Sequence, residues 1–102
     1  MALTSKERAA LRGEAHHLNA LVHVGHEGVT DAIRQLLDDT LRTKELVKVS
    51  FNKTADVDLK KEAGAIAESV GAEVVQVIGR TITIYRRNPE LKQKGDLPPW
   101  RR

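Results

Sequence analysis

Cysteine is absent from the sequence, and aromatic residues are scarce. Without a thiol among its 102 residues, the chain can form neither disulfide bonds nor thiolate metal sites. Aromatic residues make up 3% of the chain, so its core must be aliphatic. Only Phe51, Tyr85 and Trp100 could stack on bases. This argues against aromatic platforms as the main means of binding nucleic acid.

Long hydrophobic runs are also missing. No apolar stretch approaches the roughly 18 residues needed to span a bilayer. The charged stretch over residues 1–11 lacks the hydrophobic core of a signal peptide. Together with the lack of cysteine, these features predict a cytoplasmic protein with no membrane partner. The length fits one small domain with a single core.

Known catalytic patterns cannot be found either. The sequence has no Ser/His/Asp or Cys/His set, no Walker-type GK[ST] motif and no G-x-G-x-x-G motif. The adjacent Asp38 and Asp39 would point about 100° apart on a helix, as expected of a solvated face. We therefore predict no catalytic residue, no cofactor and no small-molecule substrate, and expect a binding protein rather than an enzyme.

Four histidines lie close together in the sequence, at His16, His17, His23 and His26. Such a cluster raises the question of zinc, but no carboxylate or thiol is placed to complete a set of four ligands. Polar groups on a binding face are the better interpretation, and we predict no metal site.

Positive charge is concentrated near the C-terminus. The formal net charge is +3, and residues 86–102 contain six Lys or Arg against two Asp or Glu. All three prolines lie beyond residue 87. We therefore expect residues 1–87 to form the domain and residues 88–102 to form a basic, flexible tail. This charge is compatible with a nucleic-acid partner without proving one.

A Gly-x-x-Gly loop (residues 25–28, GHEG) follows a strand-like run over residues 21–24. Its glycines allow a tight turn and leave the backbone open to a ligand. The next helix, with Thr30 as expected N-cap, directs unpaired N–H groups and its positive dipole end toward the loop. That arrangement suits a phosphate group. Two glycines can also serve the turn alone, and the charge of Glu27 opposes phosphate.

The first predicted helix has a basic outer face. Thr4 and Glu7 match a capping box at its start, and Leu11, Ala15 and Leu18 share the face expected to be buried. The opposite face holds Lys6, Ala9, Arg12, Gly13, His16 and His17, with Arg8 on the flank. Because glycine within a helix costs about 1 kcal/mol, Gly13 indicates close approach, either by another part of the fold or by a ligand.

The remaining elements complete the order α-β-α-β-α-β-β. The second helix is expected to bury Val29, Ile33, Leu36, Leu37 and Leu41. The third is expected to run from an N-cap at Asp56 to Val70, burying Leu59, Ala63, Ile66, Ala67 and Val70, with Gly64 marking tight packing. Strands are predicted over residues 45–51, 72–78 and 81–87.

Gly79-Arg80 joins the last two of these strands as a two-residue hairpin signal. The pattern predicts a two-layer α/β domain with a four-stranded mixed sheet. The strands of the β-α-β units should be parallel, and the last strand antiparallel. Arg80 would lie at the hairpin tip.

Four stretches, in matching order and spacing, resemble the CRM domain family (chloroplast RNA splicing and ribosome maturation), in particular its bacterial single-domain YhbY type. The likeness covers about residues 2–87. It rests on Leu3-Thr4 with Leu11-Arg12, Ala15-His16 and Leu18; on Val24-Gly25-x-x-Gly28-Val29-Thr30; on Glu45-Leu46-Val47-Lys48-Val49; and on Gln76-Val77-Ile78-Gly79-Arg80-Thr81 with Tyr85-Arg86.

The resemblance implies RNA binding and association with precursors of the large ribosomal subunit. It implies a fold similar to the C-terminal domain of translation initiation factor three, with strand order 1-2-4-3. The Gly-x-x-Gly loop and the basic surface beside it would then contact RNA, as in KH domains. The candidate RNA-binding residues are Lys6, Arg8, Arg12, His16, Gly25, His26, Gly28, Thr30, Arg80, Arg86 and Arg87.

Two departures from the family pattern lower the positive charge at this site. His26-Glu27 stands where the family loop usually carries Lys, Arg or Asn, and Leu18-Asn19-Ala20 stands where Leu-Lys-Pro is common. The leading hypothesis is a protein that binds ribosomal RNA during large-subunit assembly. The alternatives are an assembly adaptor without direct RNA contact, anchored by Leu46 or Trp100, and a small phosphate-ligand enzyme with a closed pocket above the loop.

Overall fold

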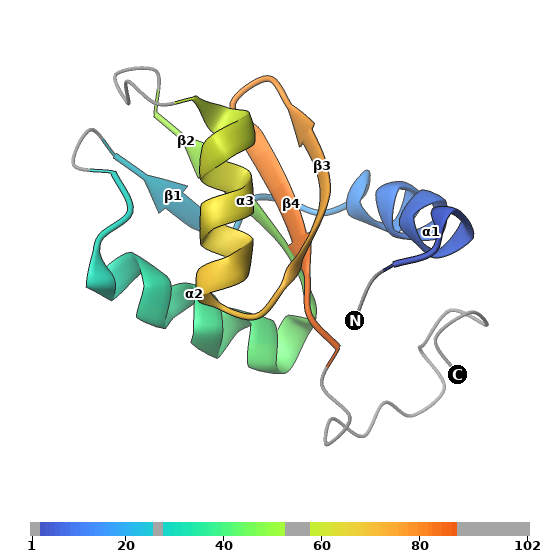
Figure 1. Cartoon of the computed structure of the whole chain (residues 1–102), viewed down its shortest axis with the longest axis horizontal. Helices are drawn as coiled ribbons and strands as arrows, with labels where there is room; N and C mark the ends of the chain where they lie inside the picture. Colours follow the sequence, from blue (N-terminus) through green and yellow to red (C-terminus); the bar gives the residue numbers. More distant parts are fainter. Residues whose placement is uncertain (1–2, 26–27, 53–57, 88–102) are drawn as a thin grey trace.

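The computed structural model of the chain describes residues 3–25, 28–52 and 58–87. Its elements are α1 (Ser5–Ala15), β1 (Val22–Val24), α2 (Asp31–Lys44), β2 (Leu46–Phe51), α3 (Leu59–Ser69), β3 (Glu73–Ile78) and β4 (Thr81–Tyr85) (Figure 1). This is the predicted order. The expected tail, Trp100, His26 and Glu27 lie outside the described residues.

The strands form one four-stranded mixed sheet in the order β1-β2-β4-β3. β1 pairs with β2 in parallel, and β4 is antiparallel to both β2 and β3. In the centre of the sheet, Val49 lies opposite Val22 on one side and Ile82 on the other. The predicted mixed sheet and its antiparallel last strand are therefore confirmed.

Helices cover the two faces of the sheet unequally. α2 and α3 lie on one face and bury the main aliphatic core there, which includes Leu37, Leu41 and Ile66 with Val47 and Val49. α1 packs on the other face, where Leu11 and Ala15 meet Leu46, Val75 and Tyr85 in a smaller cluster (Figure 1). The alternation predicted for residues 45–51 thus directs Val47, Val49 and Phe51 to α2 and α3, and Leu46 to α1.

Side-chain caps fix where each helix begins. The main-chain N–H of Thr4 donates to Glu7 Oε1 at 3.0 Å, and that of Glu7 donates to Thr4 Oγ1 at 3.1 Å, so the capping box is confirmed. Thr30 caps α2 as predicted. The N-cap of α3 is Asp58 rather than Asp56, because Asp58 accepts from the N–H of Lys60 at 3.1 Å. Two aspartates in this short stretch suit an N-cap equally well from sequence.

Two leucines expected in the core are exposed. α1 ends at Ala15, so Leu18 follows in the connection to β1 and is 37% exposed. Leu36 is 46% exposed, since the stripe of Ile33, Leu37 and Leu41 at four-residue spacing faces the sheet and Leu36 is rotated away from it.

The helical glycines do not reflect tight packing. Gly13 and Gly64 are both exposed, and a Cβ added at either would meet no described atom within 4 Å. The expectation of close packing at Gly64 is therefore wrong. For Gly13, close approach by another part of the fold is excluded among the described residues, and contact with a ligand stays a prediction.

Candidate nucleic-acid interface

The outer face of α1 is exposed and positively charged. Lys6 and Arg12 are exposed, as are His16 and His17 just beyond the helix. The two carboxylates of α1, Glu7 and Glu14, are half-buried, and Glu7 is held in the capping box. The main-chain and side-chain hydrogen bonds with Thr4 lower the pKa of the Glu7 carboxyl. The charged side chains that α1 exposes are therefore basic.

Arg8 has a different environment. Its side chain is half-buried and donates a hydrogen bond from Nη1 to the main-chain carbonyl of Val74. The β3–β4 register shifts between Val74 and Gln76, where the regular ladder is interrupted. Arg8 thus links α1 to the irregular part of β3. One of its guanidinium N–H groups is used within the fold.

The two glycines of the Gly-x-x-Gly loop are not covered by described atoms. The N–H of Gly28 donates to the carbonyl of Gly25 at 3.0 Å, which closes the turn. Gly28 has φ 76°, in the left-handed region that glycine tolerates. A Cβ added at Gly25 or Gly28 would meet no described atom within 4 Å. The described atoms therefore do not enclose these glycines, as the closed pocket of a phosphate-ligand enzyme would require.

Thr30 serves the helix that follows the loop. Its Oγ1 accepts from the N–H of Ile33 at 3.2 Å, so the hydroxyl is used as the N-cap of α2. The exposed Asp31 lies in the first turn and forms an ion pair with Arg34. This carboxylate offsets part of the attraction that the positive helix end would exert on a phosphate.

The loop and α1 lie far apart. In Figure 1, α1 lies at one end of the long axis of the molecule, and the connection from β1 to α2 lies at the other. α1 packs on the sheet face that carries Leu46 and Val75. The loop leads into α2, which packs on the opposite face. The predicted basic surface beside the loop is thus not supplied directly by α1.

Arg80 lies at the same end of the sheet as the loop. It occupies the β3–β4 turn after Gly79 (φ 57°), as predicted for the hairpin. Its Nη2 and Nε donate to the carbonyl of Asn52 at 3.0 and 3.3 Å. Asn52 in turn donates its N–H to the carbonyl of Val24 at 2.8 Å, directly before Gly25. Arg80 is therefore linked through one residue to the start of the loop.

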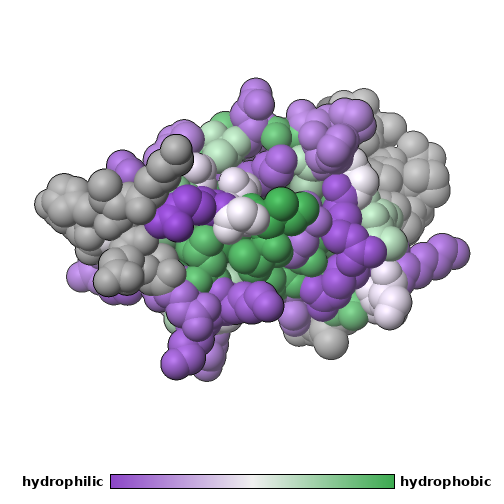
Figure 2. Space-filling view, turned by 90° about the horizontal axis from the view of Figure 1, so that it is seen from above, coloured by the Kyte–Doolittle hydropathy of each residue, from purple (hydrophilic) through white to green (hydrophobic). Residues whose placement is uncertain are grey.

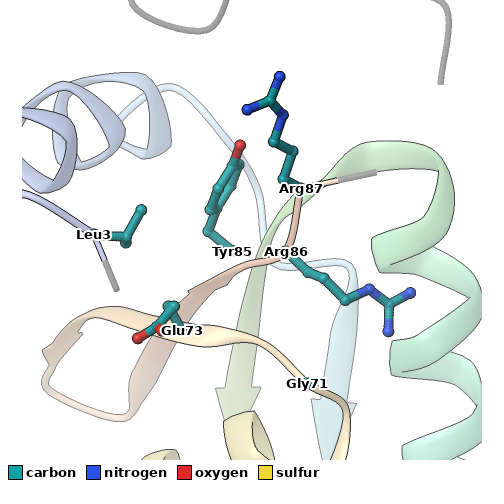
Figure 3. A pocket seen from close by; sticks show the side chains of 6 residues that line it. All are labelled: Leu3, Gly71, Glu73, Tyr85, Arg86 and Arg87. Atoms are coloured by element: carbon teal, nitrogen blue, oxygen red, sulfur yellow. The ribbon is translucent and has the colours of Figure 1, made fainter. Parts of the chain in front are cut away.

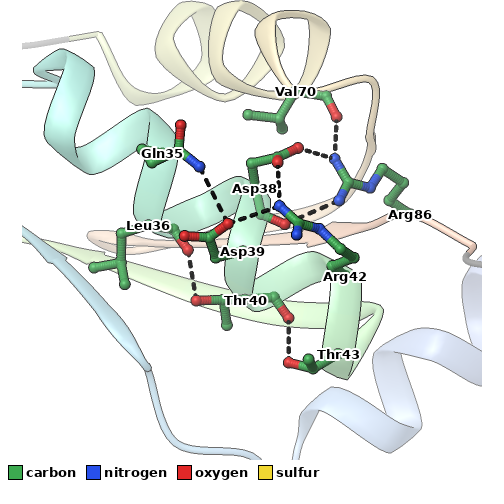
Figure 4. Close-up of polar contacts among 9 residues, drawn as sticks. All are labelled: Gln35, Leu36, Asp38, Asp39, Thr40, Arg42, Thr43, Val70 and Arg86. Atoms are coloured by element: carbon green, nitrogen blue, oxygen red, sulfur yellow. Dashed lines mark hydrogen bonds and ion pairs between the residues drawn. The ribbon is translucent and has the colours of Figure 1, made fainter.

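Arg86 is an internal link of the fold. Its guanidinium donates to Asp38 Oδ1 at 2.6 Å, to the carbonyl of Asp38 at 2.9 Å and to the carbonyl of Val70 at 2.8 Å (Figure 4). Its side chain is only 21% exposed. These bonds use the groups that would otherwise face RNA, so we do not expect Arg86 to contact RNA.

Arg87 is exposed beside a shallow hollow of about 130 Å³ that also involves Leu3, Glu73 and Tyr85. In Figure 3 the side chain of Arg87 extends away from the sheet, while that of Arg86 points toward α2. Arg87 lies near Glu7, whose pKa it lowers slightly through its charge. It therefore adds positive charge close to the start of α1.

A polar hollow lies on the uncovered part of the sheet, and of its described lining residues only His16 was a predicted site residue. It measures about 320 Å³ and is lined by His16, Lys48, Gln76, Ile78, Thr81 and Thr83. The register places Lys48 opposite Thr83, and Thr83 opposite Gln76, on the face that α1 covers only in part. The alternation of residues 45–51 and 81–87 could have predicted that Lys48, Thr81 and Thr83 share one face of the sheet. It could not have predicted that His16, after α1, lies beside them.

The described residues offer neither a group of metal ligands nor a membrane-spanning helix. Among residues 3–25, 28–52 and 58–87, no three His, Cys, Asp or Glu side chains are grouped so that they could hold a metal ion. Within the same ranges, no helix has the length and apolar character needed to cross a membrane.

Comparison with known proteins gives consistent matches. The family model described as the CRS1 / YhbY (CRM) domain matches residues 3–86. The Bacillus subtilis "Probable RNA-binding protein YqeI" is 36% identical over 91 residues, which cover 89% of this chain and 95% of that protein. A Haemophilus influenzae protein named "RNA-binding protein" is 34% identical, over 88% of this chain and 91% of its own.

A solved structure agrees with the fold. The solution structure of a Staphylococcus aureus protein is similar to this chain with a TM-score of 0.77 and 36% identity. The similarity covers 89% of this chain and 95% of the other.

Proposed function

This chain belongs to the CRS1 / YhbY (CRM) domain family, and from that premise we propose that it is an RNA-binding protein. Two relatives are named as RNA-binding proteins. We propose further that the RNA is ribosomal, in precursors of the large subunit, and that the protein acts in ribosome assembly in the cytoplasm.

The observation that carries the proposal is the charge distribution of α1. Its exposed charged side chains, Lys6 and Arg12, are basic, while its two carboxylates are half-buried. Lys and Arg that neutralise phosphates release condensed counterions, which gives sequence-independent affinity that falls with salt. Contacts to phosphates of this kind position a protein on RNA without reading its sequence.

The Gly-x-x-Gly loop would contribute by shape. Since the Gly28 N–H is used within the turn, Gly25 and Gly28 offer backbone without a Cβ rather than a set of free donors. An RNA backbone could approach Gly25 closely there, and Arg80 lies at the same end of the sheet.

A filter-binding titration with ribosomal RNA fragments at several salt concentrations tests the proposal. We expect Lys6→Glu with Arg12→Glu to lower affinity about ten-fold or more. The slope of log affinity against log salt concentration should fall by the equivalent of about 1–2 phosphate contacts. Arg8 is avoided because it bonds to Val74. Lys60→Glu with Lys61→Glu is the control, since both residues are exposed on α3, across the sheet from α1, and the change in net charge is the same. Equal losses in the two variants would remove α1 from the site.

The role in ribosome assembly has its own test. If the proposal holds, the protein co-sediments with large-subunit precursors, and nuclease or high salt releases it. An adaptor that contacts only proteins would stay bound under high salt.

Exposed apolar surface is the feature that favours such an adaptor. Figure 2 shows an apolar patch bordered by hydrophilic side chains on the face seen from above, and Leu21 is 52% exposed. Leu46, which this alternative first named as an anchor, is only 3% exposed and packs under α1. A surface role for Leu46 is therefore wrong, and the adaptor would depend on other residues.

A further inference from the structure

The hollow between the end of α1 and the uncovered sheet face differs in chemistry from the rest of the proposed interface. Its described lining residues supply one lysine, one histidine, an amide, two hydroxyls and one apolar side chain, and none of them is a carboxylate. Ile78, at its margin, is 64% exposed. A purely electrostatic contact with phosphates would need neither the amide nor the isoleucine.

Two polar side chains of this hollow are available to a ligand. Gln76 and Thr81 are half-buried, and no described residue exchanges a hydrogen bond with their side chains. Thr83 is only 1% exposed, so its hydroxyl is largely covered. An amide and a hydroxyl each carry both donor and acceptor capacity. They can therefore match the mixed donors and acceptors on the edge of a nucleobase.

Lys48 is held in place at the border of the hollow. Its Nζ donates to the carbonyl of Leu18 at 3.1 Å, which uses one of the three donors of an ammonium group. The charge remains exposed in part beside His16, which also belongs to the basic surface of α1. A phosphate bound between α1 and Lys48 would bring its own nucleotide to the hollow.

From these observations we propose that the hollow binds a single unstacked nucleobase of the RNA, and that Gln76 and Thr81 read its edge while Ile78 contacts its face. The inference rests on the proposed RNA-binding function. Sequence-specific recognition of RNA generally uses unstacked bases of single-stranded segments. Since the described lining contains no Phe, Tyr or Trp, hydrogen bonds rather than stacking on a large ring would supply the selectivity.

The position of the hollow also fits an RNA strand that crosses the sheet. Lys48 and Ser50 lie on the uncovered side of β2, and Ser50 is opposite both His23 and Thr81. This row leads from the end of α1 toward the loop that begins at Gly25. The hollow would thus lie between the basic face of α1 and the end of the sheet that carries Arg80.

Fluorescence-anisotropy titrations with short homopolymeric RNAs of each of the four bases test the inference on the full chain. We expect the wild-type protein to prefer one base over the others by roughly five-fold or more, as one hydrogen-bonding partner can supply. Gln76→Leu and Thr81→Val should each reduce this preference to less than about two-fold with an unchanged salt dependence. Gln35→Leu, the same replacement on the exposed surface of α2, should keep the preference.

The outcomes separate this inference from the proposed function. Lys6→Glu with Arg12→Glu should weaken binding of all four RNAs and leave the base preference intact. Absence of RNA binding by the wild-type protein would defeat the proposed function itself. Binding without a base preference, or with one that Gln76→Leu and Thr81→Val retain, would overturn the nucleobase site alone.

A measurement on the unmodified protein covers the case in which a variant fails to fold. Amide resonances of Gln76 and Thr81 should shift on addition of the preferred RNA, and those of Lys60 should not. Shifts confined to α1 would also overturn the site.

Discussion

Arg86 holds Asp38 by two hydrogen bonds, one to the carboxylate at 2.6 Å and one to the main-chain carbonyl at 2.9 Å. The same guanidinium reaches the carbonyl of Val70 at the end of α3. Arg86 follows β4 directly, so one side chain joins the sheet to both helices of the main core. These three bonds explain why an arginine stands at position 86 without any contact to nucleic acid.

Removal of this link should destabilise the protein. Arg86→Ala leaves the Val70 carbonyl without its donor, and a partly buried polar group that loses its partner costs ~1–3 kcal/mol. Urea unfolding followed by circular dichroism measures the loss. Arg87→Ala is the neighbouring control, since Arg87 is exposed, and it should change stability by less than ~0.5 kcal/mol. Equal stability of the two variants would show that the three bonds of Arg86 contribute little.

The Asp38 carboxyl should also make stability depend on pH in acid. Hydrogen bonds from Arg86, and then from Arg42, lower the pKa of Asp38 in the folded protein. A carboxyl with a lowered folded pKa stabilises fully above its ordinary pKa of about 4, and this contribution is lost as pH falls through the folded value. Asp38→Asn should therefore flatten the loss of stability below about pH 4 relative to wild type. Urea unfolding at a series of acid pH values gives both curves.

Glu7 also contributes to the acid dependence of stability, because its pKa is lowered, mainly by the main-chain hydrogen bond with Thr4. Its contribution needs to be measured separately in the same experiment. Glu7→Gln should remove a separate part of the acid dependence. If Asp38→Asn and wild type lose stability in parallel, the ion pair with Arg86 does not contribute to folding.

Arg8 and Arg12 should behave differently although they lie on the same helix. Arg8→Ala removes the donor to the Val74 carbonyl and should lower stability by ~1 kcal/mol. Arg12→Ala, at an exposed position, should leave stability nearly unchanged and weaken RNA binding. Parallel unfolding and filter-binding measurements on the two variants test this. A stable Arg8→Ala variant with a larger binding defect than Arg12→Ala would reverse the assignment.

Local patterns were sufficient to predict most of the elements. The Thr4–Glu7 capping box involves residues three apart, and the alternation of Val47, Val49 and Phe51 follows directly from strand geometry. Both depend only on neighbours in sequence. The end of α1 and the start of α3 were less well predicted, because several neighbouring residues could have ended or capped each helix.

The roles of individual arginines depend on distant partners and could not be predicted in this way. Arg8 bonds to a residue 66 positions away, and Arg86 to one 48 positions away. No local pattern distinguishes these two from Arg12. Glu45 is a further case, since its φ of 63° lies where glycine is expected, yet the residue is glutamate and buried. Its carbonyl accepts from the N–H of Arg86 at 2.9 Å, another contact set by the tertiary fold.

The two glycines of the loop should separate folding from binding. Gly28 has φ 76°, and a left-handed conformation costs a residue with a Cβ about 1–2 kcal/mol. Gly28→Ala should therefore destabilise the protein. Gly25 lies outside the left-handed region and has room for a methyl group, so Gly25→Ala should keep or raise stability, by up to ~1 kcal/mol.

If RNA approaches the loop backbone closely, the methyl group of Gly25→Ala lowers affinity several-fold in a fully folded protein. Thermal unfolding and filter binding of the two variants decide the matter, and a Gly25→Ala variant with wild-type affinity would remove the loop from the interface while leaving α1 in it.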